Sequence, residues 1–116
     1  MFLMAPKFLV AAGEVEISNV AYTDVAADRF DVAGTLTNSS SETREVVVRA
    51  QMTLYDRAAP RGDKPIAVIQ KDTTHILKAS ETRDIRVRLI NEGSPIRESI
   101  RKEPMMRIRR NRVWHY

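Results

Sequence analysis

The sequence predicts an all-β domain built as an antiparallel sandwich of two sheets. Several segments alternate strictly between apolar and polar residues, which is the period of a half-buried strand, and turn-forming Gly, Pro, Asn and Ser residues separate them. The length of 116 residues suits one domain with its own core. A parallel sheet is disfavoured because it needs several crossover helices, and the sequence offers one short helix.

The clearest alternation runs through residues 44–56, REVVVRAQMTLYD. One face of this segment is apolar and the other is polar, which is the pattern of a strand with one side in a core. The apolar residues are Val46, Val48, Ala50, Met52 and Leu54, and the polar residues are Glu45, Arg49, Gln51 and Thr53.

Two further segments repeat the pattern. Residues 29–38, RFDVAGTLTN, place Phe30, Val32, Gly34 and Leu36 inward, and residues 83–89, RDIRVRL, place Ile85, Val87 and Leu89 inward. The turn residues of NSSSETR, 38–44, are expected to join the strands at 29–38 and 44–56 into a hairpin. Weaker strands are expected at 14–22, 66–71 and 105–109.

One segment departs from the alternation. Ser94 can cap a helix that starts at Pro95, and Pro104 can stop it. Ile96 and Ile100 share a helical face, and Glu98 and Lys102 form a pair four residues apart. Together the elements predict an immunoglobulin-like or fibronectin-like sandwich of about six to seven strands, with one short helix near residues 95–102.

The N-terminal residues 1–13, MFLMAPKFLVAAG, are apolar, but their uninterrupted run from Phe8 to Ala12 is far shorter than the roughly 20 residues of a membrane span. Lys7 leaves only this run behind it, so a complete signal peptide is not expected. We expect a first strand or a docking segment, with a truncated export signal or anchor as the alternative. The predicted organisation is this segment, a sandwich domain at 14–109 and a C-terminal tail at 110–116.

Four segments in order, VEISNV, FDVAGTLTNSSSE, VVVRAQMTLYD and ILKASETRDIRVRL, resemble the bacterial and archaeal FxLYD family. Its members have a V.G.V.N.S strand, an F.LYD strand end and a late L..GE...F.V strand. Met52 stands where the family has Phe, and Ala79-Ser80-Glu81 stands where a Pro-Gly-Glu turn is usual. The resemblance implies a small β-sandwich, commonly in exported or surface-anchored proteins, without an established catalytic activity.

No catalytic residue, cofactor or metal site is predicted. The chain has no cysteine, which removes disulfides, thiolate metal ligands and cysteine nucleophiles together. His75 and His115 lack the spacing of metal ligands, and with four glycines the chain offers no glycine-rich phosphate loop. We therefore expect a protein that is not an enzyme.

The stretch MTLYDRAAPRGD, 52–63, contains two strings that invite a functional interpretation. The first is Leu54-Tyr55-Asp56. Leu54 continues the buried face of its strand and Tyr55 points to the opposite face, so this string is interpreted as the end of a strand. Arg61-Gly62-Asp63 lies between Pro60 and Pro65 and is interpreted as an exposed turn, with an adhesion motif as the alternative.

The charge is concentrated near the C-terminus. Six of the residues from 101 to 116 are basic and only Glu103 is acidic, which gives +5, whereas the whole chain carries +4. Continued alternation would bury Arg110 and Arg112, so the last strand is predicted to leave the sandwich near Arg109. The predicted partner-binding residues are Arg107, Arg109, Arg110, Arg112, Trp114 and Tyr116.

These observations predict a non-catalytic protein-interaction module. The resemblance suggests an accessory or structural subunit of a membrane-associated bacterial assembly, in the periplasm or at the cell surface, with the cytoplasm left open. Other protein subunits are the expected partners, contacted through the termini. Nucleic-acid binding through the tail and small-ligand binding are the alternatives, and the first is disfavoured because the remaining 100 residues carry a net charge of −1 and offer no basic surface to extend the tail.

Overall fold

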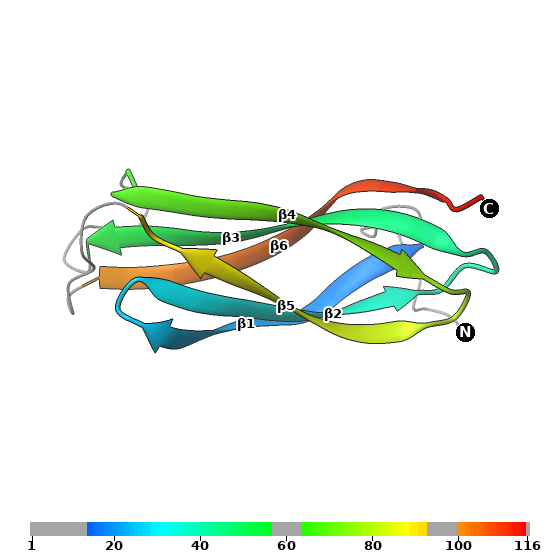
Figure 1. The fold of residues 1–116 in the computed structure, drawn as a ribbon, viewed down its shortest axis with the longest axis horizontal. Coiled ribbons are helices and arrows are strands. Elements are labelled where there is room, and N and C mark those ends of the chain that lie inside the picture. The colour runs from blue at the N-terminus through cyan, green and yellow to red at the C-terminus, as the bar shows by residue number, and fades with distance from the viewer. Residues whose placement is uncertain (1–13, 57–63, 93–99, 116) are drawn as a thin grey trace, which may run out of the picture.

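Residues 14–56, 64–92 and 100–115 are described by a computed structural model, and they form six antiparallel strands in two sheets (Figure 1). The strands are β1 (Val15–Ala26), β2 (Arg29–Asn38), β3 (Arg44–Asp56), β4 (Ala67–Leu77), β5 (Thr82–Ile90) and β6 (Ile100–Val113). The first sheet has the order β1-β2-β5, and the second has the order β4-β3-β6. The predicted all-β fold with two antiparallel sheets is confirmed.

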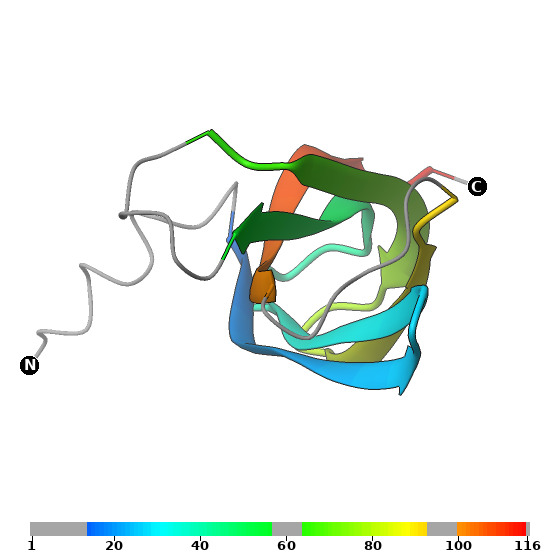
Figure 2. The ribbon, with the colours of Figure 1, turned by 90° about the vertical axis from the view of Figure 1, so that its left-hand side faces the viewer.

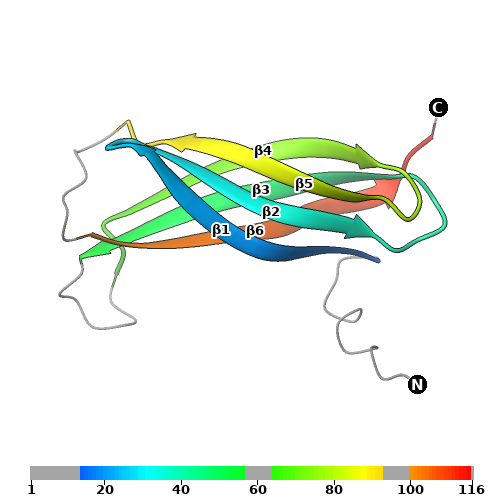
Figure 3. The ribbon, with the colours of Figure 1, turned by 90° about the horizontal axis from the view of Figure 1, so that it is seen from below.

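The two sheets pack face to face, and their edges meet in pairs (Figures 2 and 3). β1 lies along β6 at one edge, and β4 approaches β5 at the other, where a short turn joins them. Because β5 pairs with β2 and β6 pairs with β3, neighbours in a sheet are not always neighbours in the chain. This order places the last strand, β6, at a sheet edge.

The expected hairpin between residues 29–38 and 44–56 is wrong. β2 pairs with β1 and β5, whereas β3 pairs with β4 and β6, so the two strands lie in different sheets. The connection between them crosses from one sheet to the other. The turn residues of 38–44 are compatible with a hairpin and with such a crossing, because both need tight turns stabilised by short polar side chains.

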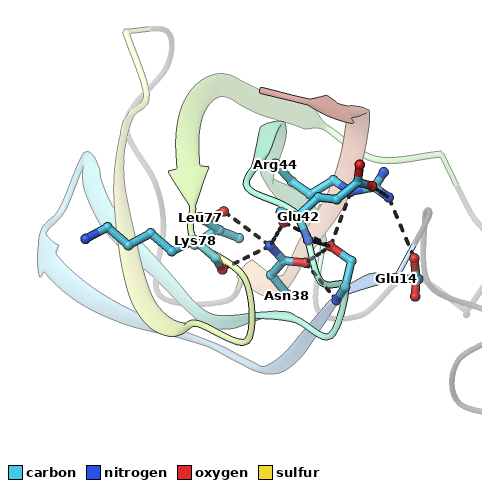
Figure 4. Close-up of polar contacts among 7 residues, drawn as sticks. Glu14, Asn38, Glu42, Arg44, Leu77 and Lys78 are labelled. Carbon is cyan, nitrogen blue, oxygen red and sulfur yellow. Dashed lines mark hydrogen bonds and ion pairs between the residues drawn. The ribbon is translucent and has the colours of Figure 1, made fainter. Parts of the chain in front are cut away.

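Asn38, whose side chain is fully buried, holds this crossing in place (Figure 4). Its amide nitrogen donates hydrogen bonds to the backbone carbonyls of Glu42, Leu77 and Lys78, at 2.9, 3.2 and 3.0 Å. Its side-chain oxygen accepts hydrogen bonds from the backbone N–H and the hydroxyl of Ser40, at 3.0 and 2.7 Å. One amide thus ties the connection between β2 and β3 to the turn between β4 and β5, and we call these five residues the Asn38 corner.

Arg44 closes the corner on its solvent side. Its guanidinium lies 3.6 Å from the carboxylate of Glu14 and 3.4 Å from that of Glu42. Its Nε atom donates a hydrogen bond of 3.4 Å to the Ser40 hydroxyl. The Asn-x-Ser spacing of the resembled strand motif therefore has a structural role here, because Ser40 supplies the donors that satisfy the buried oxygen of Asn38.

Two predictions for the C-terminal residues are wrong. Residues 100–102 of the helix predicted near 95–102 belong to β6, and residues 95–99 lie outside the described residues. Lys102 lies 2.9 Å from Asp24 of β1 in an ion pair, where the helix would have paired it with Glu98. The predicted tail at 110–116 is mostly strand, because β6 continues to Val113 in register with β3. Pairing with β3 overrides the local helix signal of residues 100–102, and the same pairing keeps residues 110–113 in the sheet.

The core contains the ten larger apolar residues that the alternation predicts to be buried between the sheets. These are Phe30, Val32, Leu36, Val46, Val48, Met52, Leu54, Ile85, Val87 and Leu89. Gly34 lies on the inner face of β2, where a Cβ atom would be 2.8 Å from the Sδ atom of Met106. The glycine lets this β6 side chain reach under the first sheet. The described part of the chain contains no helix with the length and hydropathy of a membrane span.

Candidate binding surface on the outer face of β6

The basic C-terminal residues form a row on the outer face of β6, the side of the second sheet that faces away from the core. Arg101, Arg107, Arg110 and Arg112 all lie opposite residues of β3 that alternate with its buried residues. Arg107, Arg109, Arg110 and Arg112 are exposed. The structure therefore brings the predicted basic residues together on a rigid strand.

A β-bulge at Arg109 keeps this row outside. Val48 lies opposite Ile108, while the adjacent Val47 lies opposite Arg110, so Arg109 is an extra residue in β6. The bulge reverses the alternation of the strand beyond it. The prediction that the strand leaves the sandwich near Arg109 is wrong, because the bulge keeps Arg110 and the arginine that follows on the outer face without ending the pairing.

β3 and β4 add an arginine and a carboxylate to the same face. Arg49 of β3 lies opposite Arg107, and its guanidinium donates two hydrogen bonds to Asp72 of β4, at 2.8 and 3.2 Å. Like charges directly opposite each other destabilise a sheet. Asp72 offsets this repulsion from one side of Arg49 only. Sequence reasoning places Arg49 on the outer face but not in the site, because the alternation does not reveal which residue lies opposite.

The pKa of Asp72 is lowered by the arginines around it. The hydrogen bonds from Arg49 lower the pKa of Asp72 most, burial opposes this shift, and the charges of Arg49, Arg109 and Arg107 lower the pKa further. The same hydrogen bonds raise the pKa of Arg49. Arg109 and Arg107 are thus close enough to this carboxylate for their charges to act on it.

Two more carboxylates of this face are each paired with one arginine. Glu45 lies 2.6 Å from the Nε atom of Arg112, and Glu103 lies 3.1 Å from the Nε atom of Arg101. The Arg101 guanidinium also lies 4.5 Å from the centre of the Tyr55 ring, a cation–π distance. The charges of Arg101 and Arg112 are therefore partly neutralised by neighbouring carboxylates.

Arg107, Arg109 and Arg110, which we call the bulge arginines, differ from these pairs. Among the described residues, none of the three has a carboxylate within ion-pair distance. They follow one another along β6, with only Ile108, which faces the core, between the first and the second. Three exposed guanidiniums therefore point away from the core without an ion pair in the described part of the chain, although the charges of Arg107 and Arg109 act on Asp72 from a longer distance.

The outer faces of the two sheets differ in charge. The outer face of the second sheet has six arginines and three carboxylates, which gives a net charge of +3. The outer face of the first sheet has three arginines and three carboxylates and is neutral. On the second sheet these residues are Arg49, Arg101, Arg107, Arg109, Arg110, Arg112, Glu45, Asp72 and Glu103. On the first sheet they are Arg29, Arg86, Arg88, Glu16, Asp31 and Asp84. The excess positive charge thus belongs to one face of the domain.

Exposed apolar side chains lie on the same face, toward its other end. Met105 is 42% exposed and Val68 is 46% exposed, and both point outward in register with β3. Ile66, just before β4, is 58% exposed. Arginine, methionine and tyrosine are enriched in protein interfaces relative to the rest of a protein surface. This face therefore contains residue types that are enriched in interfaces.

β6 is an edge strand of its sheet. β3 is its single hydrogen-bonded neighbour among the described residues. β1 runs beside the other edge and contacts β6 through side chains, as in the ion pair of Lys102, whose amine also lies 5.4 Å from the centre of the Phe30 ring. Pro104 lies within β6. Proline within a sheet is confined to edge strands, strand starts and bulges.

The remaining predicted residues have other surroundings. The backbone N–H of Trp114 donates a hydrogen bond of 2.9 Å to the carbonyl of Thr43, which ties Trp114 to the end of the sheet. Its side chain is half-buried. Tyr116 and the Arg61-Gly62-Asp63 triplet lie outside the described residues. Tyr55 is on the outer face, as predicted.

The two histidines have different surroundings. His75 lies 2.8 Å from the Thr73 hydroxyl through its Nε2 atom, and burial, together with the charge of Arg83, lowers its pKa. His115, two residues after the end of β6, is exposed. Within the described ranges, no three His, Asp or Glu side chains are grouped so that they could hold a metal ion.

No protein-family model matches the chain, and no curated protein matches it. A solved structure, that of Pseudomonas fluorescens alkylpurine DNA glycosylase AlkC bound to DNA containing an abasic site analog, is similar with a TM-score of 0.51 and 16% sequence identity. The match covers 93% of this chain and 32% of the glycosylase chain. At this identity the likeness concerns the fold alone, and the chain spans about a third of the length of that protein.

Proposed function

We propose that this domain is a non-catalytic protein-interaction module that docks on an acidic partner protein through the outer face of the second sheet. The bulge arginines are the observation that carries the proposal. None of them forms an ion pair with the described carboxylates, and Arg107 lies opposite the like charge of Arg49, an arrangement that does not stabilise the sheet. An acidic surface would supply the missing counter-charges, and the exposed apolar side chains of the same face would add buried area.

The resemblance to the FxLYD family supports a location for this module. Domains of that kind are common in exported and surface-anchored proteins, so we propose an accessory or structural subunit of a membrane-associated bacterial assembly. The periplasm and the cell surface are the proposed compartments. This part of the proposal depends on the resemblance and is independent of the arginine face.

The docking proposal is tested with two variants of equal charge change. Arg107→Ala with Arg110→Ala removes two charges from the positive face, and Arg29→Ala with Arg86→Ala removes two from the neutral face. Proteins that co-purify with the untagged chain from its native membranes are identified, and the affinity of the purified partner is then measured by calorimetry. The first variant should lose the partner and the second should keep it; equal retention would contradict the proposal.

Nucleic-acid binding is a second candidate, and the arrangement of the basic residues supports it. The arginines belong to a sheet face that also includes Arg49 of β3, so the basic surface is larger than a short tail. The fold resembles part of a DNA glycosylase whose structure contains DNA. A phosphate backbone would satisfy the bulge arginines as well as carboxylates would.

Salt dependence separates the two candidates. If Arg107, Arg109, Arg110 and Arg112 bind phosphates, the affinity for DNA or RNA should fall with salt at a log-log slope of roughly −3 to −4. Each Arg→Ala substitution should then lower the slope by about one, whatever the nucleotide sequence. Submicromolar binding with this slope would favour nucleic acid over a protein partner.

A further inference from the structure

The bulge brings the bulge arginines closer together than the regular spacing of a strand. In a regular strand, neighbouring side chains of one face are two residues apart, which is roughly 6.6–6.8 Å. Arg109 and Arg110 are consecutive residues, so their Cα atoms are about 3.8 Å apart. Both are exposed, and Arg107 lies two residues before Arg109. Three positive charges are therefore concentrated within residues 107–110 of one strand.

Register and electrostatics place this concentration of charge beside the pair of Arg49 and Asp72. Arg49 lies opposite Arg107 on one side and opposite Asp72 on the other, so the three residues form one row across the sheet. The charge of Arg109 also lowers the pKa of Asp72, which agrees with a side chain on the outer face. Asp72 already accepts two hydrogen bonds from Arg49, at 2.8 and 3.2 Å. The positive charge of the bulge arginines therefore remains in excess.

The next row across the sheet has short side chains. Val47 of β3 lies opposite Thr74 of β4 on one side and opposite Arg110 on the other. The side chains of Val47 and Thr74 are uncharged and extend less far from the sheet than an arginine does. The row after that contains Glu45, whose carboxylate is paired with an arginine of β6. A group bound over Val47 would therefore be flanked by arginines of two rows.

The spacing of the bulge arginines favours one kind of acidic ligand over another. Acidic side chains on one face of an extended segment are roughly 6.6–6.8 Å apart, so two of them do not match two consecutive arginines. A single carboxylate can accept a bidentate pair of hydrogen bonds from one guanidinium. A phosphoryl group on a serine, threonine or tyrosine has a charge of roughly −1.5 to −2 at pH 7 and three acceptor oxygens. One such group can therefore accept hydrogen bonds from several guanidiniums at once.

We infer that the bulge arginines, together with Arg49, bind one phosphoryl group on a segment of the partner protein. The inference rests on the proposed function and deepens it, because it names the chemistry of the acidic group that the partner presents. Arginine clusters are a recurring means of recognising phosphorylated segments. Met105 is exposed on the same face, one row away from Arg107, and would contact residues beside the phosphorylated one.

Four peptides of equal length test the inference with the full chain. They share a neutral sequence of Gly, Ser and Leu and differ at the centre, which is serine, phosphoserine, one aspartate or two consecutive aspartates. The two aspartates match the charge of the phosphoryl group with two separate carboxylates. We expect the phosphoserine peptide to bind roughly tenfold more tightly than the two-aspartate peptide in calorimetry at moderate salt, and the serine peptide to bind most weakly.

Matched variants assign the binding to the bulge. Arg109→Ala should weaken binding of the phosphoserine peptide roughly tenfold, because one guanidinium is lost. Arg112→Ala removes a charge from the same strand and face, but Arg112 is paired with Glu45, so binding should weaken roughly twofold or less. Asp72→Asn should strengthen binding roughly threefold, because it removes the negative charge beside Arg49.

A conservative variant and amide chemical shifts keep the test independent of folding. Arg109→Lys retains the charge and loses the planar fork, so it should recover part of the binding that Arg109→Ala loses, even where alanine disturbs the bulge. Addition of the phosphoserine peptide should change the amide shifts of Val47, Thr74 and residues 107–110. The amide shifts of β5, in the other sheet, should stay unchanged.

Other results overturn the inference in distinguishable ways. Equal binding of the phosphoserine and two-aspartate peptides, or no binding of the phosphoserine peptide, would overturn the inference, while a partner identified by co-purification would still support the proposed function. Inorganic phosphate that binds as tightly as the phosphoserine peptide would make the free ion the ligand. A DNA or RNA strand that binds more tightly than every peptide at the same salt would overturn both the inference and the proposed function.

Discussion

The Asn38 corner and the bulge arginines are both polar clusters at irregular points of the sandwich, and they use their polar atoms in opposite ways. In the corner, the fully buried amide of Asn38 donates hydrogen bonds to backbone carbonyls and accepts hydrogen bonds from Ser40, so its polar atoms all stabilise the fold. At the bulge, three exposed guanidiniums have no acidic partner among the described residues. Buried polar groups must be hydrogen-bonded for the fold to be stable. Exposed like charges are not required by the fold, so they remain available for a partner.

Asn38→Ala should give the largest effect on stability. The substitution leaves the carbonyls of Glu42, Leu77 and Lys78 without this donor and removes the acceptor of Ser40. We expect the free energy of unfolding to fall by about 3 kcal/mol or more. Urea denaturation measures it. A loss below about 1 kcal/mol would mean that the corner is not a structural device, and the contrast with the arginines would disappear.

Val48→Ala sets the scale for an apolar core position. Val48 is fully buried between the sheets, and the substitution removes two methyl groups and leaves a void. We expect a loss of about 1–3 kcal/mol. If Asn38→Ala is at least as costly as this substitution, a single polar side chain is as important to the fold as core packing. An unchanged melting temperature for Val48→Ala would contradict the core assignment itself.

Ser80→Gly should stabilise the turn to which Asn38 is tied. Ser80 has a φ of 63°, in the left-handed region where glycine is unstrained. It stands where a Pro-Gly-Glu turn is usual in the resembled family. Relief of the strain should raise the free energy of unfolding by about 0.5–1 kcal/mol, after the greater flexibility of glycine in the unfolded chain is subtracted. Ser39→Gly, at an exposed position of the other connection, is the control; a decrease for Ser80→Gly would contradict the prediction.

The sequence predicts the composition of the core better than the connections between strands. Alternation with period two reports which side chains are buried, and the two clearest strands, β2 and β3, have the predicted bounds. It does not report which strand lies opposite, so the hairpin between them is wrong. β6 fails for the same reason, because its start has helix-compatible spacing that pairing with β3 overrides.

The basic residues of the candidate surface could be predicted from the sequence, but their arrangement could not. The charge excess near the C-terminus identifies Arg107, Arg109, Arg110 and Arg112, but the bulge that places them all outside depends on the register with β3. Arg49 becomes part of the site only because of that register. Asn38 has a sequence signal in the Asn-x-Ser spacing, whereas its hydrogen bonds to Leu77 and Lys78 are contacts between distant segments.

The two regions should also respond differently to pH. Burial lowers the pKa of His75, near the β4 end of the corner, so the folded state favours neutral His75 and the unfolded state binds more protons below about pH 6.5. Stability should therefore fall as the pH drops from 6.5 to 5.5. Denaturation of the chain and of His75→Gln measures this, since the variant should lose that part of the pH dependence. Arginine stays charged throughout this range, so the bulge arginines should contribute no pH dependence; a pH dependence that persists unchanged in His75→Gln would contradict the assignment to His75.

The smallest effect on stability should come from the bulge arginines themselves. Arg107→Ala and Arg110→Ala remove exposed side chains that have no ion pair among the described residues, so the free energy of unfolding should change by less than about 0.5 kcal/mol. For Arg107→Ala the change should be a gain, because the substitution removes the like charge opposite Arg49. The gain should be largest at low salt and vanish at high salt, where the repulsion is screened.

Arg49→Ala is the contrasting variant, since it leaves Asp72 without its hydrogen bonds and should destabilise the sheet. A clear loss of stability in Arg107→Ala would show that the bulge arginines serve the fold, as Asn38 does, and would remove the main reason for assigning them to a partner.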